Sequence, residues 1–213
     1  MKVRSIYHFS ELMDNEFSWR IKEISIFKRL VLSGHEEHRK CLRRAAIPII
    51  YCHWEGFVKT VADHYGSFVS DQVAKMSDLK SCFMGPMLKA KFDDIVGSKR
   101  SFKLWHEGSE LVKKLADEKP KISLFGRLSH VGNLNYDVFS EIAYVCGLDM
   151  TYYETKKNFI DEIIVAKRNK VAHGEFLQSD EAEIVEAIDL VIEIMRTLKT
   201  DLENGAVLKS YLN

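Results

Sequence analysis

Residues 153–202, YETKKNFIDEIIVAKRNKVAHGEFLQSDEAEIVEAIDLVIEIMRTLKTDL, decide the fold class of this chain. Apolar residues recur in this stretch at spacings of three and four, which predicts amphipathic helices. A helix is predicted over 153–172, with its apolar positions at Ile160, Ile163, Ile164 and Val171. A second helix is predicted to begin after Ser179 or Asp180, both good N-cap residues, and to end at Asn204-Gly205. We therefore expect two helices joined by a short polar linker.

Another long helix is predicted from about Phe9 to Leu32. It is expected to end at Ser33-Gly34, because glycine commonly follows the last turn of a helix. Its expected buried stripe consists of Leu12, Trp19, Ile24, Phe27 and either Leu30 or Val31.

The next helix is predicted over 36–69 and contains Pro48. A proline inside a helix removes a hydrogen bond, so Pro48 is expected either to kink this helix or to mark its true start. The expected buried stripe consists of Leu42, Ala46, Ile49, His53, Gly56/Phe57, Thr60 and His64.

The middle of the chain, approximately 75–133, has weaker patterns and is interpreted as a helical and loop insertion before the motif-bearing helix over 153–172. Its predicted parts are a turn at Met84-Gly85-Pro86, short helices over 88–95 and 101–116, and a loop over 122–135. A short helix is predicted over 136–145, ended by Gly147. No set of strands is predicted. The sequence thus predicts a single all-α domain over 1–213, a helical bundle with antiparallel neighbours.

The composition of the chain excludes some classes of protein. The 31 Lys and Arg residues equal the 31 Asp and Glu residues, whereas a protein that coats long nucleic acid is usually much more basic. The four cysteines form no C-x-x-C pair and match no zinc spacing, which favours free thiols in a reducing cytoplasm. We find no signal peptide and no apolar run of about 20 residues, so a cytoplasmic protein with no membrane segment is expected.

Chemistry is expected at Arg168-Asn169-Lys170-Val171-Ala172-His173, which Gly174 follows as the expected helix cap. A guanidinium is always charged and an imidazole titrates near neutral pH, a combination that suits metal-free phosphodiester chemistry. On an ideal helix Arg168 and His173 lie about 140° apart, so they do not share a face, whereas Asn169 and His173 do. With Ile160 and Val171 on the buried stripe, we expect Asn169 and His173 on the far side and Arg168 on the flank.

One chain is therefore not expected to assemble a tight catalytic pair. If the motif helix packs against its own copy, two-fold symmetry gathers two arginines and two histidines in one cleft. A homodimer is the resulting hypothesis. Taken by itself, so short a pattern is explained more simply by a solvated arginine and a histidine near the helix cap.

The motif resembles that of the HEPN family, the higher eukaryote and prokaryote nucleotide-binding helical domains. That family has an arginine, a polar residue, three to five further residues and a histidine, which Arg168 to His173 match. Tyr51-Cys52-His53-Trp54-Glu55-Gly56-Phe57-Val58-Lys59 resembles the aromatic-Glu-Gly-aromatic-x-Lys segment of the RiboL-PSP-type branch, which is often encoded in defence loci. The predicted order of helices also fits, so the resemblance covers the whole chain in outline.

This resemblance implies a metal-independent endoribonuclease that acts as a homodimer on RNA, with no metal ion and no cofactor. His173 would be the general acid/base for attack of the RNA 2′-hydroxyl on the adjacent phosphate. Arg168 would stabilise charge on the phosphorane oxygens. Asn169 would orient His173 or bind phosphate, and Lys170 is a supporting RNA-binding candidate. The expected role is in phage defence or as a toxin, and single-stranded RNA is the expected substrate.

Glu55 and Lys59 are further supporting candidates. They stand four residues apart in the favourable order for an ion pair on a helix. Two interpretations are open: an exposed salt bridge that contributes little, or a pair that lines the dimer cleft near His173.

Other titratable residues are given structural interpretations. His53 and His64 lie on the predicted apolar stripe and are expected to be core residues rather than ligands. His35 and His38, with Glu36 and Glu37 between them, are expected to form a solvated helix start rather than a metal site.

The partner and the activity are both open to alternatives. Some HEPN toxins are silenced by a nucleotidyltransferase that modifies a tyrosine two positions past the motif histidine, where this chain has Glu175, followed by Phe176. This departure argues against such a partner, while another antitoxin or defence-system subunit stays open. Many HEPN proteins lack nuclease activity, so the alternative function is a non-catalytic HEPN interaction module that assembles with another defence or toxin-antitoxin component.

Overall fold

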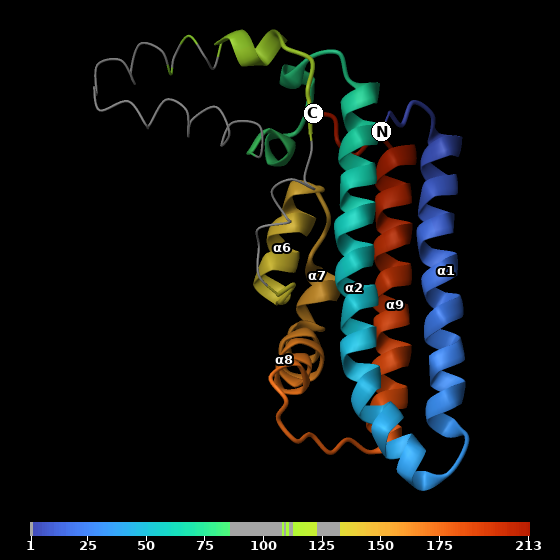
Figure 1. Ribbon diagram of the computed structural model, residues 1–213. Coiled ribbons are helices and arrows are strands. Elements are labelled where there is room, and N and C mark those ends of the chain that lie inside the picture. Colours follow the sequence, from blue (N-terminus) through green and yellow to red (C-terminus); the bar gives the residue numbers. More distant parts are fainter. Residues whose placement is uncertain (1, 86–107, 109, 111–112, 123–132) are drawn as a thin grey trace.

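The computed structural model describes residues 2–85, 108, 110, 113–122 and 133–213. Three long helices lie side by side, and each contacts the other two (Figure 1); they are α1 (Ile6–Leu32), α2 (Glu36–Gln72) and α9 (Glu181–Val207). A second group of short helices stands on the other side of α2, formed by α6 (Tyr136–Val145), α7 (Thr151–Glu154), η2 (Phe159–Ala166) and α8 (Lys167–Ala172). A 3-10 turn, η1 (Met76–Asp78), follows α2.

The described ranges contain no β-strand, only one isolated bridge between Leu79 and Leu212. The prediction of an all-α bundle is therefore confirmed. None of the helices in these ranges is both long and apolar enough to cross a membrane. That residues 1–213 form a single domain stays a prediction.

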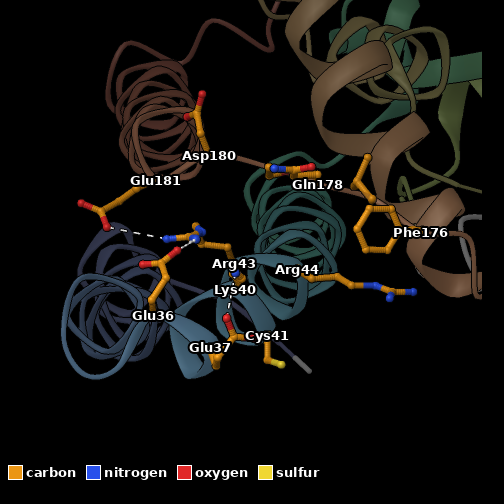
Figure 2. A pocket seen from close by; sticks show the side chains of 12 residues that line it. Glu36, Glu37, Lys40, Cys41, Arg43, Arg44, Phe176, Gln178, Asp180 and Glu181 are labelled. Atoms are coloured by element: carbon orange, nitrogen blue, oxygen red, sulfur yellow. Dashed lines mark hydrogen bonds and ion pairs between the residues drawn. The ribbon is translucent and has the colours of Figure 1, made fainter.

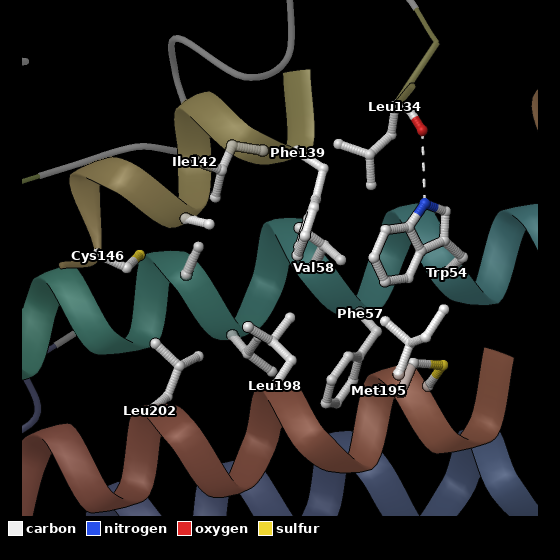
Figure 3. Close-up of a cluster of buried hydrophobic side chains, with 14 of the residues drawn as sticks. Trp54, Phe57, Val58, Leu134, Phe139, Ile142, Cys146, Met195, Leu198 and Leu202 are labelled. Carbon is white, nitrogen blue, oxygen red and sulfur yellow. Dashed lines mark hydrogen bonds between the residues drawn. The ribbon is translucent and has the colours of Figure 1, made fainter. Parts of the chain in front are cut away.

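Helix α2 is the central element, because it contacts α1, α9, η2, α8 and α6. A helix with neighbours on several sides is apolar on several sides. The single stripe predicted for it is accordingly only partly right. Ala46, His53 and Phe57 are buried, but so are residues on other faces, including Ile50, Tyr51, Trp54, Val58 and Val61. Figure 3 shows α2 contributing side chains both toward α6 and toward α9.

The stripe predicted for α1 needs a larger correction. Trp19 was expected in the core but is 47% exposed; of the two alternatives Leu30 and Val31, Val31 is buried. Arg20 is buried in the stripe instead, where it pairs with Glu16 and donates 3.0 Å to the Glu16 carbonyl. Gly56 leaves room for it, since a Cβ there would lie 3.2 Å from Arg20 Nη2. A buried arginine cannot be recognised from apolar spacing.

The ends of the helices follow from capping residues. Ser5 accepts a hydrogen bond from the His8 N–H, which starts α1 three residues before the predicted Phe9. Asp180 accepts from the Glu183 N–H, so of the two predicted N-caps of α9 it is the one used. Gly34 and Gly147 have positive φ and follow α1 and α6 as predicted.

The predicted end of α9 is wrong, while for Pro48 the structure decides between the two predicted alternatives. Helix α9 does not end at Asn204-Gly205 but runs through both to Val207. Gly205 is there for close packing, because a Cβ on it would lie 2.7 Å from the hydroxyl of Tyr65. Pro48 does not mark the start of α2, which begins at Glu36, although its first turns bend relative to the rest (Figure 1).

Much of the predicted insertion falls on residues that the structure does not describe. The predicted helix over 88–95 lies outside the described residues, as do Pro86 and most of the ranges 101–116 and 122–135. Residues 113–116 are helical, as predicted, and the helix also includes Asp117. Residues 81–85 are also helical, so Met84 and Gly85 belong to a helix and not to the predicted turn.

The close approach of Gly205 to Tyr65 gives a stability prediction. In Gly205→Ala the added methyl group would meet a ring that is 1% exposed and has no room to move, so the free energy of unfolding should fall by about 1–3 kcal/mol. Gly85→Ala is the control, since nothing lies within 4 Å of its Cβ position and a helical alanine is favoured by up to about 1 kcal/mol. Urea unfolding measures both. Adding Tyr65→Phe to Gly205→Ala removes the hydroxyl and should recover much of the lost free energy of unfolding. A Gly205→Ala protein as stable as wild type would contradict close packing between Gly205 and Tyr65.

The buried histidine in α2 predicts how stability depends on pH. Burial lowers the pKa of His53 below its ordinary value of 6.5; the Glu23 carboxylate opposes this shift and Arg20 adds to it. As pH falls, His53 therefore binds a proton in the unfolded chain at a higher pH than in the folded chain. The contribution of neutral His53 to the free energy of unfolding is complete above about pH 6.5 and is lost as the pH falls toward the lower pKa of the folded state.

His53→Phe should make this loss shallower when urea midpoints at about pH 7.5 and about pH 5 are compared. Some dependence of stability on pH will remain in His53→Phe, because burial also lowers the pKa of His64. His38→Gln, at an exposed position, serves as the control. Identical slopes for wild type and His53→Phe would show that His53 is not buried in its neutral form.

Candidate functional site

The motif lies at the C-terminal end of α8, where the chain turns away from the helix. Gly174 has φ +78°, its N–H donates 3.1 Å to the Val171 carbonyl, and the Glu175 N–H donates 2.9 Å to the Lys170 carbonyl. These two bonds form a Schellman cap, which satisfies carbonyls that the helix leaves free. The predicted cap at Gly174 is thus confirmed. His173 is the last residue before the turn, and its side chain is exposed.

The segment before α8 is a π-helix, η2, and this changes the faces predicted for the motif. Its hydrogen bonds span five residues rather than four, so the helix is wider and each residue turns less about the axis. Counting from Ile160 as if the helix were ideal therefore misplaces the residues after it. Asn169, predicted on the far side, is half-buried and faces the chain before α6, whereas His173 is exposed as predicted.

Arg168 is held in a small cluster of amide side chains. Its Nη1 donates 2.7 Å to Oδ1 of Asn133 and 2.9 Å to Oδ1 of Asn169. Nδ2 of Asn133 donates 2.9 Å to the same oxygen of Asn169. The three side chains therefore fix one another. Asn133 is a site residue that the sequence did not reveal, because it lies in an irregular segment with no pattern of its own.

The position of Asn133 depends on the next residue, Leu134, whose backbone α2 holds at two points. The Leu134 N–H donates 2.8 Å to the hydroxyl of Tyr51, and Nε1 of Trp54 donates 3.4 Å to the Leu134 carbonyl (Figure 3). Both aromatic side chains are buried, so the bonds are shielded from water. Tyr51 and Trp54 thus present Asn133 to the motif.

Tyr51 also contacts the arginine directly. The guanidinium carbon of Arg168 lies 4.5 Å from the centroid of the Tyr51 ring, a cation–π arrangement. Burial raises the pKa of Tyr51 to about 12; the bond from Leu134 and the charge of Arg168 act against this shift, and Glu55 adds to it. The hydroxyl therefore keeps its proton near neutral pH and stays a neutral acceptor for the Leu134 N–H.

The cluster leaves one edge of the guanidinium unused. Arginine has five N–H donors, and the bonds to Asn133 and Asn169 engage only Nη1. In the parts of the chain that the structure describes, no acceptor bonds Nε or Nη2 of Arg168. These two nitrogens form the fork that suits a phosphate or carboxylate ligand. The arginine is therefore fixed in direction and still able to bind an anion.

The remaining predicted residues are distributed around this cluster. Glu55 lies one turn beyond Tyr51 on α2, close enough to affect the pKa of the Tyr51 hydroxyl. Lys59 donates 2.8 Å to the carboxylate of Glu55. The predicted ion pair is confirmed, and both side chains are half-buried. Lys170 is exposed. The described contacts include none between the side chains of Arg168 and His173 or of Asn169 and His173.

The candidate metal cluster at the start of α2 is engaged otherwise. Glu37 pairs with Lys40, and Glu36 pairs with both Arg39 and Arg43. Across the described ranges, no group of three or more His, Cys, Asp and Glu side chains is arranged to hold a metal ion.

An all-α bundle with the Arg-x-x-x-x-His motif at the end of a helix packed on a central helix defines a HEPN-type domain. The family model described as RiboL-PSP-HEPN matches residues 15–204, so the chain belongs to the RiboL-PSP-HEPN family. Neither the curated proteins nor the solved structures contain a match to the chain. Membership in this family points toward a nuclease or other RNA-related role.

The anchoring of Leu134 predicts the effect of removing one hydroxyl. Tyr51→Phe keeps the ring beneath Arg168 but leaves the buried Leu134 N–H without an acceptor, which should lower the free energy of unfolding by about 1–3 kcal/mol. Tyr7→Phe, at a side chain that is 85% exposed, should be neutral. Urea unfolding of the two variants tests this. Equal stability of Tyr51→Phe and Tyr7→Phe would mean that the bond does not hold the segment.

Proposed function

We propose that this protein is a metal-independent endoribonuclease that cleaves RNA by attack of a 2′-hydroxyl on the adjacent phosphate. The P–O5′ bond breaks, and the products are a 2′,3′-cyclic phosphate and a 5′-hydroxyl. The observation that carries this proposal is the fixed guanidinium of Arg168, whose Nε and Nη2 edge bonds no acceptor among the described residues, in a chain of the RiboL-PSP-HEPN family.

Arg168 has the features of a phosphate clamp. A donor set that is already oriented before the substrate binds stabilises the charge that develops in the transition state without further reorganisation. Asn133, Asn169 and the Tyr51 ring supply that orientation. Asn169 in this proposal positions Arg168, because its side-chain oxygen accepts from Arg168 and Asn133.

His173 suits proton transfer. It is exposed at the helix end, next to a turn that lets a substrate approach, and an imidazole can accept or donate a proton near neutral pH. One imidazole takes the proton of the 2′-hydroxyl as the new P–O bond forms. A protonated imidazole gives a proton to the departing O5′.

A homodimer is part of the proposal because one chain keeps the two side chains apart. Arg168 is directed toward Asn133 and Tyr51, while His173 projects to solvent one turn and a half farther along. If two copies meet with their α8 helices across a two-fold axis, the histidine of one chain can face the arginine of the other. Two histidines in one cleft would also supply both the base and the acid.

We further propose that the substrate is single-stranded and that the enzyme acts in phage defence or as a toxin restrained by a partner. Attack by the neighbouring 2′-hydroxyl needs a backbone that can reach in-line geometry, and a flexible single strand reaches it more easily than a duplex. The zero net charge favours recognition through a few local contacts.

One observation favours a second function, a non-catalytic HEPN interaction module. Stacking on Tyr51 and bonding to Asn133 and Asn169 also describe an arginine that only holds the bundle together. In that case α8 would offer His173 and Lys170 to a partner protein rather than to RNA.

Cleavage assays separate the two functions. Purified protein in EDTA should cleave unstructured RNA, and His173→Ala should lower the rate by about 10²–10⁴-fold through loss of proton transfer. Arg168→Ala should lower it by about 10²–10³-fold, with Arg168→Lys restoring little, because a lysine has no fork of donors. His8→Ala, in the first turns of α1, is the matched control and should cleave at the wild-type rate.

The products give a second readout. The 3′ ends of the RNA products should resist direct ligation, and mass spectrometry should show a 2′,3′-cyclic phosphate on them. Cleavage that EDTA abolishes would contradict the metal-free route. Wild-type protein that cleaves no RNA, while the purified protein binds a partner through α8, would favour the interaction module.

A further inference from the structure

A cavity of about 640 Å³ lies between the first turns of α2 and the linker that joins α8 to α9 (Figure 2). Its volume is within the range of pockets that hold a drug-sized ligand or a nucleotide, about 300–1,000 Å³. Its lining combines cationic, anionic and aromatic side chains. No step of the proposed reaction uses these residues.

The anionic side of the cavity is largely neutralised by ion pairs. Glu36 accepts 2.6 Å from Arg43, whose side chain is buried, and Glu37 accepts 2.8 Å from Lys40. Glu181 accepts 2.8 Å from Arg39. These three carboxylates are therefore compensated by cations, while Asp180, which also lines the cavity, accepts from the Glu183 N–H at the start of α9.

Arg44 and Phe176 form the opposite side. Nη2 of Arg44 donates 2.9 Å to the carbonyl of Glu175, the residue before Phe176. No carboxylate in the described ranges pairs with Arg44, so its charge is available to an anion. The Phe176 ring is 83% exposed, and Figure 2 shows it on the same side of the cavity as Arg44. An exposed aromatic ring beside an unpaired guanidinium is the combination that binds a base and its phosphate.

The cavity also lies beside the motif. The bond between Arg44 and the Glu175 carbonyl closes one edge of it, and Glu175 is two residues after His173. Two steps of about 3.8 Å along the chain separate these Cα atoms at most. Phe176 is one residue farther, so at most about 11 Å separate its Cα atom from that of His173, and a ligand seated on Phe176 lies near the motif.

We propose that this cavity binds one unpaired nucleotide of the RNA, next to the phosphate that the motif attacks. The base stacks on Phe176, the phosphate binds Arg44, and the exocyclic amino group of the base donates to the carboxylates on the far side. Because the ligand is RNA, this inference rests on the proposed function. It assigns substrate binding to Phe176 and Arg44, which lie outside the motif.

Binding can be measured without cleavage. The probe is a fluorescent single-stranded RNA whose 2′-hydroxyls are methylated, so the wild-type protein cannot cleave it. Phe176→Ala should weaken binding by about 10-fold or more, Phe176→Tyr should bind within about two-fold of wild type, and Arg44→Gln should weaken binding and reduce its salt dependence. Tyr144→Ala, at an aromatic side chain that is 63% exposed on α6, should have no effect. Circular dichroism confirms that each variant folds.

Two exposed cysteines provide an independent footprint in the wild-type chain. Cys41 lines the cavity, while Cys52 lies at a separate hollow beside Trp19 and Pro48. The methylated RNA should slow the alkylation of Cys41 by iodoacetamide and leave that of Cys52 unchanged, as read by mass spectrometry. A duplex of the same sequence should protect neither.

The outcomes for the cavity and for the reaction are distinguishable. If the methylated RNA binds Phe176→Ala as tightly as wild type and Cys41 stays unprotected, the cavity proposal fails, while cleavage that depends on His173 still supports the proposed function. If Phe176→Ala leaves RNA binding intact but splits the dimer in sedimentation, Phe176 belongs to a protein interface and the proposal is overturned. If wild-type protein cleaves no RNA but binds the methylated strand through Phe176, the cavity stands and the nuclease proposal fails.

Discussion

The direction of Arg168 depends on how α2 holds the backbone at Leu134. Tyr51 accepts from the Leu134 N–H and Trp54 donates to the Leu134 carbonyl, so two side chains one turn apart on a buried helix fix a segment that has no regular structure. That segment carries Asn133, and Asn133 orients both Arg168 and Asn169. Tyr51 then acts a second time, because its ring lies beneath the guanidinium. The central helix thus supports the bundle and the motif with the same residues.

This arrangement packs one side of the half-buried Arg168 against protein and leaves its other side without a partner among the described residues. Its Nη1 is committed to the protein, while Nε and Nη2 face no acceptor in the described ranges. A group fixed in this way loses little further freedom when an anion binds, which is the condition for electrostatic stabilisation of a transition state. In the linker after His173, Arg44 bonds the Glu175 carbonyl and Phe176 lies open to solvent. In the proposed function, a protein of zero net charge would bind RNA through these few placed groups.

The sequence predicted the elements better than their environments. Spacing of apolar residues placed all three long helices, and capping rules identified Asp180 and Gly174. The spacing of apolar residues failed where a polar residue is buried, as at Arg20, or a large apolar one is exposed, as at Trp19. The packing of Arg20 against Gly56 and its pairing with Glu16 leave no trace in that spacing. The spacing also placed Asn169 on the wrong face, because η2 is a π-helix and the prediction assumed an ideal α-helix. Asn133 could not be found from sequence, since its role comes from the fold alone.

The central claim is that Arg168 and His173 act together across two copies of the chain. The most direct measurement uses a heterodimer of Arg168→Ala and His173→Ala chains, made by co-expression with two different tags and purified through both. Its cleft would contain one intact pair, with Arg168 from one chain facing His173 from the other. The account predicts that this heterodimer cleaves RNA in EDTA more slowly than wild type, because only one imidazole remains, but clearly faster than either variant alone. A heterodimer as inactive as the two homodimeric variants would contradict the claim.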